Sequence, residues 1–320
     1  MKVLVTGGAG FIGSNLVEAL LSDERVTKVR VLDNLATGSL NNIKDFVSSK
    51  NFEFIEGDIR NIETCLASTT DIDLISHQAA LGSVPRSIND PLTTNNVNVA
   101  GTLNIFHAAI QNNVKRVVFA ASSSTYGDSK SLPKVENKIG NPLSPYAVTK
   151  YVNEVYADVF SKTYDFEYIG LRYFNVFGPK QSPEGAYAAV IPLFFKAALE
   201  NTSPTINGDG SFSRDFTFVQ NVVHANLQSL FFESTQNEPS PQNQIYNVAF
   251  GERVSIDQLW TAIKEISGSE AEAIYGSVRD GDVPHSLASI EKARSLLNYR
   301  PKVDLIKGLN ISYKWFLENY

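Results

Sequence analysis

The sequence predicts an α/β protein with a doubly wound parallel sheet, covered by helices on both faces, and a smaller α/β domain toward the C-terminus. Short β-branched runs alternate with helical patterns through the first half of the chain, as is typical of parallel sheets. A glycine-rich turn separates the first of these strands from the first helix. The chain has 320 residues, about twice the ~150 of one typical domain.

The predicted elements follow one another in a regular order. Strands are expected at Lys2 to Thr6, Val29 to Asp33, Phe52 to Ile55, Asp73 to His77, Arg116 to Ala120 and Glu167 to Arg172. Helical periodicity is clearest in Phe11 to Leu21, Thr94 to Gln111 and Pro145 to Thr163. After Asn175 the alternation weakens. That half predicts a helix around Val190 to Leu199, strands at Thr205 to Asn207 and Gln244 to Ala249, and helices that begin near Ser255 and Ser289.

The composition excludes several classes of protein. Hydrophobic residues make up 43% of the chain and charged residues 19%, which provides for a large core and is unlike a disordered chain. The net charge of −6 and the isoelectric point near 5.4 are opposite to the basic character of nucleic-acid-binding proteins. Nucleic acid is therefore not an expected partner, and we expect phosphate to be bound by backbone amides and a few arginines.

The cysteine, histidine and apolar patterns bear on the compartment, on metal binding and on membrane segments. Cys65 is the single cysteine, so the chain can form no internal disulfide, which favours the reducing cytoplasm. The four histidines lie on different predicted elements without ligand spacing, and no metal site is predicted. The longest mostly apolar run, Ala186 to Phe195, is far shorter than the ~20 residues that span a bilayer, so no membrane segment is expected.

The segment Thr6 to Gly13 (TGGAGFIG) joins the first strand to the first helix. Its glycines permit a tight turn, let backbone amides approach a pyrophosphate and allow the helix to pack closely on the strand. Asp33 ends the second strand 20 residues after Gly13, where a carboxylate would bind an adenosine ribose. A 2′-phosphate would meet a like charge there, so the pattern predicts NAD rather than NADP. Asp58, after the third strand, either contacts the adenine or stabilises a turn.

Tyr146 and Lys150 lie one helical turn apart, on the same face of the helix that Pro145 would start. A nearby ammonium and a positively charged nicotinamide ring would both favour the tyrosine phenolate, which makes the tyrosine usable as a base near neutral pH. Ser122, which begins a serine run directly after the fifth strand, supplies a hydroxyl at the ligand-binding edge of the sheet.

Further motifs occur in an order shared with one enzyme superfamily: Asp33-Asn34, Gly57-Asp58, His77 to Ala80 (HQAA), Ala121 to Gly127 (ASSSTYG) and Leu171 to Gly178 (LRYFNVFG). With the glycine turn and the Tyr146/Lys150 pair, they resemble the extended short-chain dehydrogenase/reductase superfamily over nearly the whole chain. Ala80 to Ser87 (ALGSVPRS), ASSSTYG and Gly185 to Pro192 (GAYAAVIP) are similar to UDP-N-acetylglucosamine 4-epimerases.

This resemblance implies a Rossmann-type NAD-binding domain at 1–175, to which 215–250 return, and a discontinuous nucleotide-sugar domain at 176–320. It implies the interconversion of UDP-GlcNAc and UDP-GalNAc by transient oxidation at carbon 4, with NAD regenerated in each cycle. The cofactor-binding residues that it implies are Gly7, Gly10, Phe11, Ile12, Gly13, Asp33, Asn34, Asp58, Ile59, Ala79, Tyr146, Lys150 and Tyr173.

The resemblance also assigns the catalytic roles. Tyr146 would take the proton from the sugar's 4-hydroxyl group while the hydride passes from carbon 4 to NAD. Ser122 would form a hydrogen bond with the same oxygen. Lys150 would hold the nicotinamide ribose and lower the pKa of the tyrosine.

The substrate-binding residues that the resemblance implies are Gly82, Ser83, Ser122, Ser123, Asn175, Ala189, Val190, Asn207, Arg214, Arg279 and Ser286. Arg214 and Arg279 would grip the diphosphate, whose oxygens suit paired guanidinium groups, although each arginine could instead form a surface ion pair with a neighbouring aspartate. Asn175 would contact the diphosphate and the sugar, and Asn207 would lie near the uracil or the ribose.

Ser286 bears on the choice of sugar. Glucose-restricted relatives carry a bulky tyrosine at the corresponding position, whereas a serine leaves room beside carbon 2 for an acetamido group. The small residues Gly82, Ser83 and Ala189 indicate the same roomy site. Space alone allows the N-acetylated sugar to bind but does not select it, because specificity also requires a loss of binding free energy for the wrong sugar.

Several alternatives stay open. The chain could be an epimerase that prefers UDP-N-acetylhexosaminuronic acid or UDP-glucose. A UDP-glucuronate decarboxylase should have a carboxylate-reading arginine and an acidic residue in the serine loop, and neither is evident. A 4,6-dehydratase would need Asp-Glu where Ser123-Ser124 stand. A non-catalytic NAD-binding sensor would usually lack the Tyr/Lys pair.

Two further expectations concern surfaces. The helices Thr94 to Gln111 and Pro145 to Thr163 match those that form the dimer interface in relatives, so the resemblance implies a homodimer. Gln220 stands where relatives commonly carry an acidic residue, which would alter a contact at the domain junction.

Overall fold

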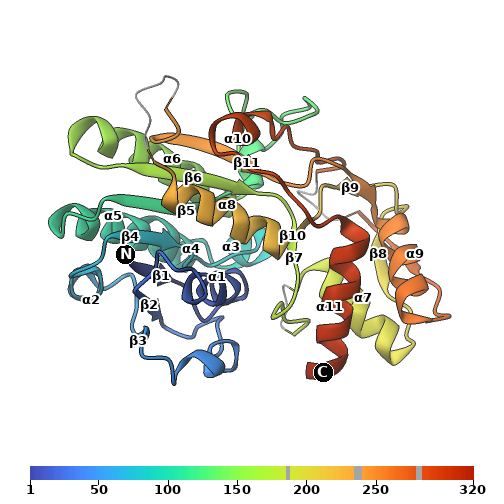
Figure 1. The fold of residues 1–320 in the computed structure, drawn as a ribbon. Helices are drawn as coiled ribbons and strands as arrows, with labels where there is room; N and C mark the ends of the chain where they lie inside the picture. Colours follow the sequence, from blue (N-terminus) through green and yellow to red (C-terminus); the bar gives the residue numbers. More distant parts are fainter. Residues whose placement is uncertain (185–187, 234–239, 279–282) are drawn as a thin grey trace.

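The computed structural model describes residues 1–184, 188–233, 240–278 and 283–320 (Figure 1). Its centre is a seven-stranded sheet in which all neighbouring strands run parallel, in the order β11-β6-β5-β4-β1-β2-β3. The strands are β1 (Lys2–Thr6), β2 (Lys28–Asp33), β3 (Phe52–Glu56), β4 (Leu74–His77), β5 (Arg116–Ser122), β6 (Tyr168–Tyr173) and β11 (Gln244–Val248). The chain order reverses between β1 and β4, so the predicted doubly wound sheet is confirmed.

Helices cover both faces of this sheet because side chains along each strand point alternately to opposite sides. Val3 and Val5 of β1 belong to the core beneath α1 (Phe11–Leu21) and α8 (Val219–Phe231). Leu4 belongs to the opposite core, beneath α2 (Ile62–Thr69), α5 (Thr102–Gln111) and α6 (Pro145–Thr163). In Figure 1, α1 and α8 lie in front of the strands.

The C-terminal part forms a third core from three helices: α7 (Val190–Glu200), α9 (Ile256–Ser267) and α11 (Leu305–Asn319). Three short strand pairs surround it: β7 (Val176–Phe177) with β10 (Thr217–Phe218), β8 (Thr205–Asn207) with β13 (Ile274–Gly276), and β9 (Ser213–Arg214) with β12 (Val254–Ser255). Both α8 and β11 return to the main sheet. The sequence placed α10 (Glu291–Leu296) in the smaller domain, but this helix also packs on the core of the main sheet, through Ile290 and Ala293.

The predicted helix from Thr94 to Gln111 is interrupted. The chain runs through α3 (Val84–Asn89) and α4 (Pro91–Asn95), then a π-helical segment, Asn96–Gly101, before α5 begins. Within the π segment, Asn98 is fully buried and its amide binds both backbone groups of Leu81, at 2.8 and 3.0 Å. Wide turns of this kind often occur at functional sites. The apolar periodicity gave no sign of the interruption, and the helices α8 and α11 were also not predicted.

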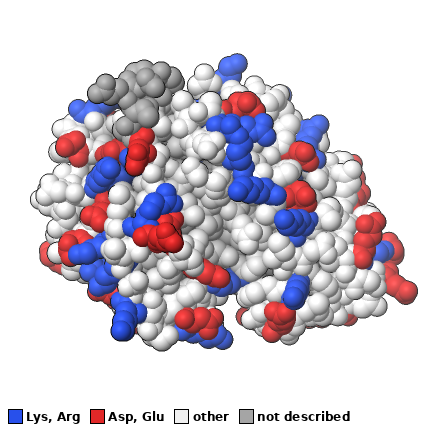
Figure 2. Space-filling view, in the orientation of Figure 1, with Lys and Arg blue, Asp and Glu red and all other residues white. Residues whose placement is uncertain are grey.

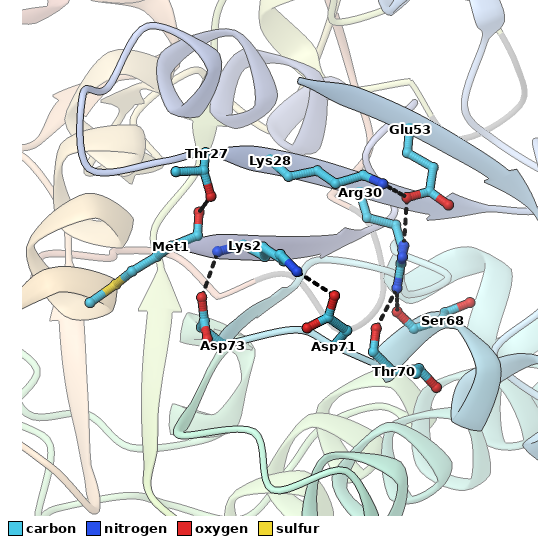
Figure 3. Close-up of polar contacts among 10 residues, drawn as sticks. All are labelled: Met1, Lys2, Thr27, Lys28, Arg30, Glu53, Ser68, Thr70, Asp71 and Asp73. Atoms are coloured by element: carbon cyan, nitrogen blue, oxygen red, sulfur yellow. Dashed lines mark hydrogen bonds and ion pairs between the residues drawn. The ribbon is translucent and has the colours of Figure 1, made fainter. Parts of the chain in front are cut away.

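Figure 3 shows charged residues at the amino-terminal edge of the sheet. Glu53 of β3 binds Lys28 at 2.5 Å and Arg30 at 3.0 Å, both on the neighbouring strand β2. Lys2 of β1 pairs with Asp71 in the turn before β4. These contacts join adjacent strands at the edge opposite to the carboxyl ends. On the face in Figure 2, cationic and anionic side chains are interspersed. No helix in the described ranges is long and apolar enough to cross a membrane.

Candidate active site

A cavity of about 600 Å³ lies at the carboxyl ends of the parallel strands, where ligands bind in sheets of this kind. The structure brings many of the sequence-predicted residues together in its wall. They are Gly7, Gly10, Phe11, Ile12, Gly13, Asp33, Asn34, Asp58, Ile59, Ala79, Gly82, Ser83, Ser122, Ser123, Tyr146, Lys150, Tyr173 and Asn175.

The glycine turn after β1 is closely packed. Gly7 has a φ of +68°, and a Cβ atom there would lie 2.7 Å from the backbone nitrogen of Ala79. A Cβ atom on Gly13 would lie 2.1 Å from the carbonyl oxygen of Gly7. No side chain caps the start of α1 at Gly10, so the first N–H groups of this helix remain available to a ligand in the cavity. The turn therefore requires glycine and offers an anion site.

Two carboxylates lie beside the turn. Asp33 is buried at the end of β2, where it accepts hydrogen bonds from the backbone N–H groups of Ala9 at 2.9 Å and Leu35 at 2.8 Å. Asp58 forms an ion pair with Arg60 at 2.7 Å, and the Arg60 hydrogen bond lowers the pKa of Asp58 to about 2. Both carboxyl groups thus lie at one end of the cavity, where Asp58 is paired with Arg60.

Tyr146 and Lys150 project from the first turns of α6 toward the end of β5. Burial raises the pKa of the Tyr146 phenol, and a hydrogen bond with Ser122 opposes this rise. Lys150 lies with its Nζ 5.9 Å from the centre of the Tyr146 ring and donates a hydrogen bond to the carbonyl oxygen of Ala120 at 2.7 Å. The three groups therefore share one enclosed site, in which a proton could move to or from the phenol.

The charge of Lys150 is adjusted by its surroundings. Burial lowers its pKa to about 8, and Glu154, one turn further along α6, raises it. Glu154 in turn binds Arg172 of β6 through two hydrogen bonds, at 2.9 and 2.6 Å, and both side chains are buried. This ion pair fixes α6 against the sheet directly behind the tyrosine and the lysine.

Tyr173 and Gln78 close the cavity on the side of β4 and β6. The Tyr173 hydroxyl donates to Gln78 Oε1 at 3.1 Å and accepts from Asn226 of α8 at 2.8 Å. Gln78 also donates to Asn226 Oδ1 at 3.0 Å. The sequence prediction omitted Gln78, Ala80 and Leu81 from the site, although all line the cavity directly after β4. Their position after a strand end was a usable signal.

Five predicted substrate-binding residues lie outside the wall of this cavity: Ala189, Val190, Asn207, Arg214 and Ser286. Arg214 is half-buried in β9 and donates to the carbonyl oxygens of Ser213 and Pro284, each at 3.1 Å. Arg279 lies outside the described residues. Gln220 is exposed near the start of α8.

His77 and Cys65 are buried in the fold and lie outside the cavity wall. His77 is buried between Thr6 Oγ1 at 2.6 Å and Thr102 Oγ1 at 2.9 Å, and burial lowers its pKa to about 3. Burial raises the pKa of the Cys65 thiol to about 12. Within the described part of the chain, no group of three or more His, Cys, Asp and Glu side chains could hold a metal ion.

The doubly wound sheet, the glycine turn and the acid at the end of β2 together define a dinucleotide-binding protein. The residues present fit NAD, because the closely packed glycines leave the backbone accessible to a pyrophosphate and Asp33 favours an unphosphorylated ribose.

Comparison with known proteins identifies the family. A model described as "NAD dependent epimerase/dehydratase family" matches residues 3–249. A putative UDP-glucose 4-epimerase of Methanocaldococcus jannaschii is 39% identical over 319 residues, 99% of each chain. The solved UDP-N-acetylglucosamine 4-epimerase from Methanobrevibacter ruminantium, in complex with UDP-N-acetylmuramic acid, has a TM-score of 0.92 and 38% identity, over 100% of this chain and 99% of that one. The Thermotoga maritima UDP-glucose 4-epimerase with UDP-glucose gives 0.91 and 35%, over 99% of both chains.

The chain belongs to the NAD-dependent epimerase/dehydratase family. The predictions of this family, of an enzyme and of NAD as its cofactor are thereby confirmed.

Proposed function

We propose that this protein is an NAD-dependent UDP-sugar 4-epimerase that interconverts UDP-GlcNAc and UDP-GalNAc. The enclosed arrangement of Tyr146, Lys150 and Ser122 beside the dinucleotide cavity carries the proposal. The relatives with named activities support a UDP-sugar 4-epimerase. The N-acetylated sugar is supported by the named activity of the M. ruminantium enzyme and by open space at Gly82, where an added Cβ atom would meet nothing within 4 Å.

The side chains act in the following way. Tyr146 accepts the proton of the sugar's 4-hydroxyl group and later returns it, and Ser122 donates a hydrogen bond to the same oxygen. Lys150 stabilises the Tyr146 phenolate by its positive charge. When bound, NAD supplies the two-electron chemistry at carbon 4. The glycine turn after β1 and Asp33 would hold this cofactor in the cavity that Tyr146 also lines.

The substrate would extend from this cavity toward the C-terminal part. Asn175, in the wall of the cavity, would contact the diphosphate and the sugar. Arg214 would neutralise a phosphate oxygen, and Asn207 would lie near the uracil or the ribose. Ser286 and Ala189 would leave room for the acetamido group.

The first experiment incubates the purified protein with UDP-GlcNAc and, separately, with UDP-glucose, and resolves the 4-epimers by proton NMR. We expect UDP-GalNAc to form from UDP-GlcNAc at a higher rate than UDP-galactose from UDP-glucose. A faster reaction with UDP-glucose would overturn the N-acetyl preference, in line with the relatives named for UDP-glucose. Absence of both products, with NAD supplied, would contradict the epimerase proposal and direct the assay to UDP-GlcNAc uronic acid and UDP-glucuronate.

We also propose that the protein is a homodimer formed through α6. Val148, Tyr151, Val155 and Val159 are exposed at helical spacing along one side of α6. Leu92 of α4, which packs beside α6, is 77% exposed. Exposed apolar residues that gather on one side of a helix are typical of a protein–protein interface. A second copy of the chain would cover them through a self-complementary contact.

Light scattering after size-exclusion chromatography tests this proposal. We expect a mass of twice 35.2 kDa for the wild type and a shift toward the single-chain mass for Val155→Asp, because the dimer interface would then bury two unpaired carboxylates. A wild-type protein that elutes as a single chain at all concentrations would contradict the dimer.

A further inference from the structure

One fully buried carboxylate, Asp215, has no role in the chemistry described above. It lies between β9 and β10 and has no exposed surface. Its Oδ1 accepts from the backbone N–H groups of Phe250 at 3.1 Å and Gly251 at 3.2 Å. Its Oδ2 accepts from Gly251 at 3.2 Å and from Ala288 at 3.1 Å. A single side chain thus joins three segments that are distant in the sequence.

Two of the three joined segments carry or adjoin a residue assigned above to the nucleotide sugar. Arg214 directly precedes Asp215 in the chain. Ala288 follows Ser286 by two residues. The segment of Ser286 also pairs with β9, because Ser286 donates its backbone N–H to the carbonyl oxygen of Ser213 at 3.0 Å. Arg214 and Ser286 therefore belong to one small unit, which Asp215 fixes to the loop after β11.

The backbone of Asp215 reaches a third substrate residue, Asn175. The amide Nδ2 of Asn175 donates to the carbonyl oxygen of Asp215 at 3.3 Å, and the carbonyl oxygen of Asn175 accepts from Thr217 at 3.2 Å. Asn175 has a φ of +35°, in the left-handed region that non-glycine residues adopt infrequently. Hydrogen bonds with Asp215 and with Thr217 thus hold Asn175 in this conformation.

We propose that Asp215 is a positioning residue for the nucleotide-sugar site, which sets the places of Asn175, Arg214 and Ser286 relative to the NAD cavity. This inference rests on the proposed function. A carboxylate suits the task because both of its oxygens accept hydrogen bonds, so that it satisfies N–H groups from two loops at once. An asparagine offers one acceptor, and its NH₂ group would face an N–H group of Gly251 or Ala288.

The test compares Asp215→Asn with the wild type by calorimetric titration of UDP and of NAD and by steady-state kinetics with the nucleotide sugar that the wild type converts. We expect the UDP dissociation constant and the KM to rise about tenfold or more, because small displacements of binding groups have large effects. The NAD dissociation constant and kcat should stay within about threefold. A merely structural residue would weaken both ligands together or lower kcat as much as kcat/KM.

A second variant and a control distinguish a specific effect on UDP binding from a general loss of the fold. Ala288→Pro deletes one N–H donor and keeps Asp215, and it should raise the UDP dissociation constant in the same direction by a smaller factor. Asp304→Asn is the matched control: Asp304 is exposed and accepts the Lys307 N–H at the start of α11 at 2.8 Å, a task that asparagine also performs. It should leave all constants unchanged.

The outcomes separate the two proposals. Unchanged UDP binding in both Asp215→Asn and Ala288→Pro would overturn the positioning role while leaving the epimerase intact. Equal losses of UDP and NAD binding would also overturn it. A wild-type protein that binds NAD but no UDP would contradict the proposed function itself.

Discussion

Replacing Tyr146 by phenylalanine should lower kcat for epimerisation by about 10² to 10⁴, the range typical of a lost general acid–base group. The substitution removes only the hydroxyl oxygen that takes and returns the proton, and Ser122 has no basic character to replace it. NAD binding should persist, since Gly7, Gly13 and Asp33 are untouched. The measurement is the rate of 4-epimer formation by proton NMR, together with the rise in melting temperature that NAD produces.

Tyr164 provides the control for this prediction. It is exposed just after the end of α6, and Tyr164→Phe removes the same atom away from the cavity. The control should keep the wild-type rate. If Tyr146→Phe also kept that rate while binding NAD, the catalytic assignment of Tyr146 would be wrong.

The second large effect is expected for Ser286→Tyr. Ser286 is half-buried, and its backbone is held to Ser213 at 3.0 Å, so an added aromatic ring could not be accommodated by moving the strand away. We expect the ring to occupy the space of the acetamido group. The ratio of kcat/KM for UDP-GlcNAc over UDP-glucose should fall by about 10² or more, which corresponds to about 3 kcal/mol of lost discrimination.

UDP-glucose serves as the internal reference in that experiment, because it has a hydroxyl group at carbon 2 and should still be converted. Competition between the two sugars in one NMR sample measures the ratio directly. An equal loss on both sugars would show that the tyrosine damages the site in general and would refute a role for Ser286 in selecting the sugar.

Much of the fold could be predicted because the strands of a parallel sheet are buried on both faces and appear as short apolar runs. The strands from Lys2 to Tyr173 and the strand β11 follow from these runs, and α1 and α6 follow from helical periodicity, with boundaries that differ by at most two residues. The return of β11 to the main sheet was implied by the family resemblance. The cavity wall was predictable for a related reason. Residues such as Gly7, Asp33 and Ser122 come at strand ends, and all parallel strands end at the same edge.

The missed features depend on contacts between distant segments. The π-helical segment at Asn98 follows from a side chain that binds Leu81, and no periodicity encodes such a partner. The four hydrogen bonds of Asp215 likewise involve backbone groups of Phe250, Gly251 and Ala288, which have no side-chain signature. The α10 region packs on the main core although it follows a long stretch of C-terminal elements.

The route of the chain between its cores limits how the molecule can come apart. After β6 the chain leaves the main sheet, returns for α8 and β11, leaves again for α9, returns for α10 and ends in α11 among the C-terminal helices (Figure 1). Neither lobe is a continuous length of polypeptide. Cleavage of one peptide bond therefore cannot separate a complete lobe, and unfolding of one lobe would also disrupt segments that pack in the other. We expect the protein to fold and unfold as one cooperative unit. We expect only small movements between the lobes when ligands bind or dissociate.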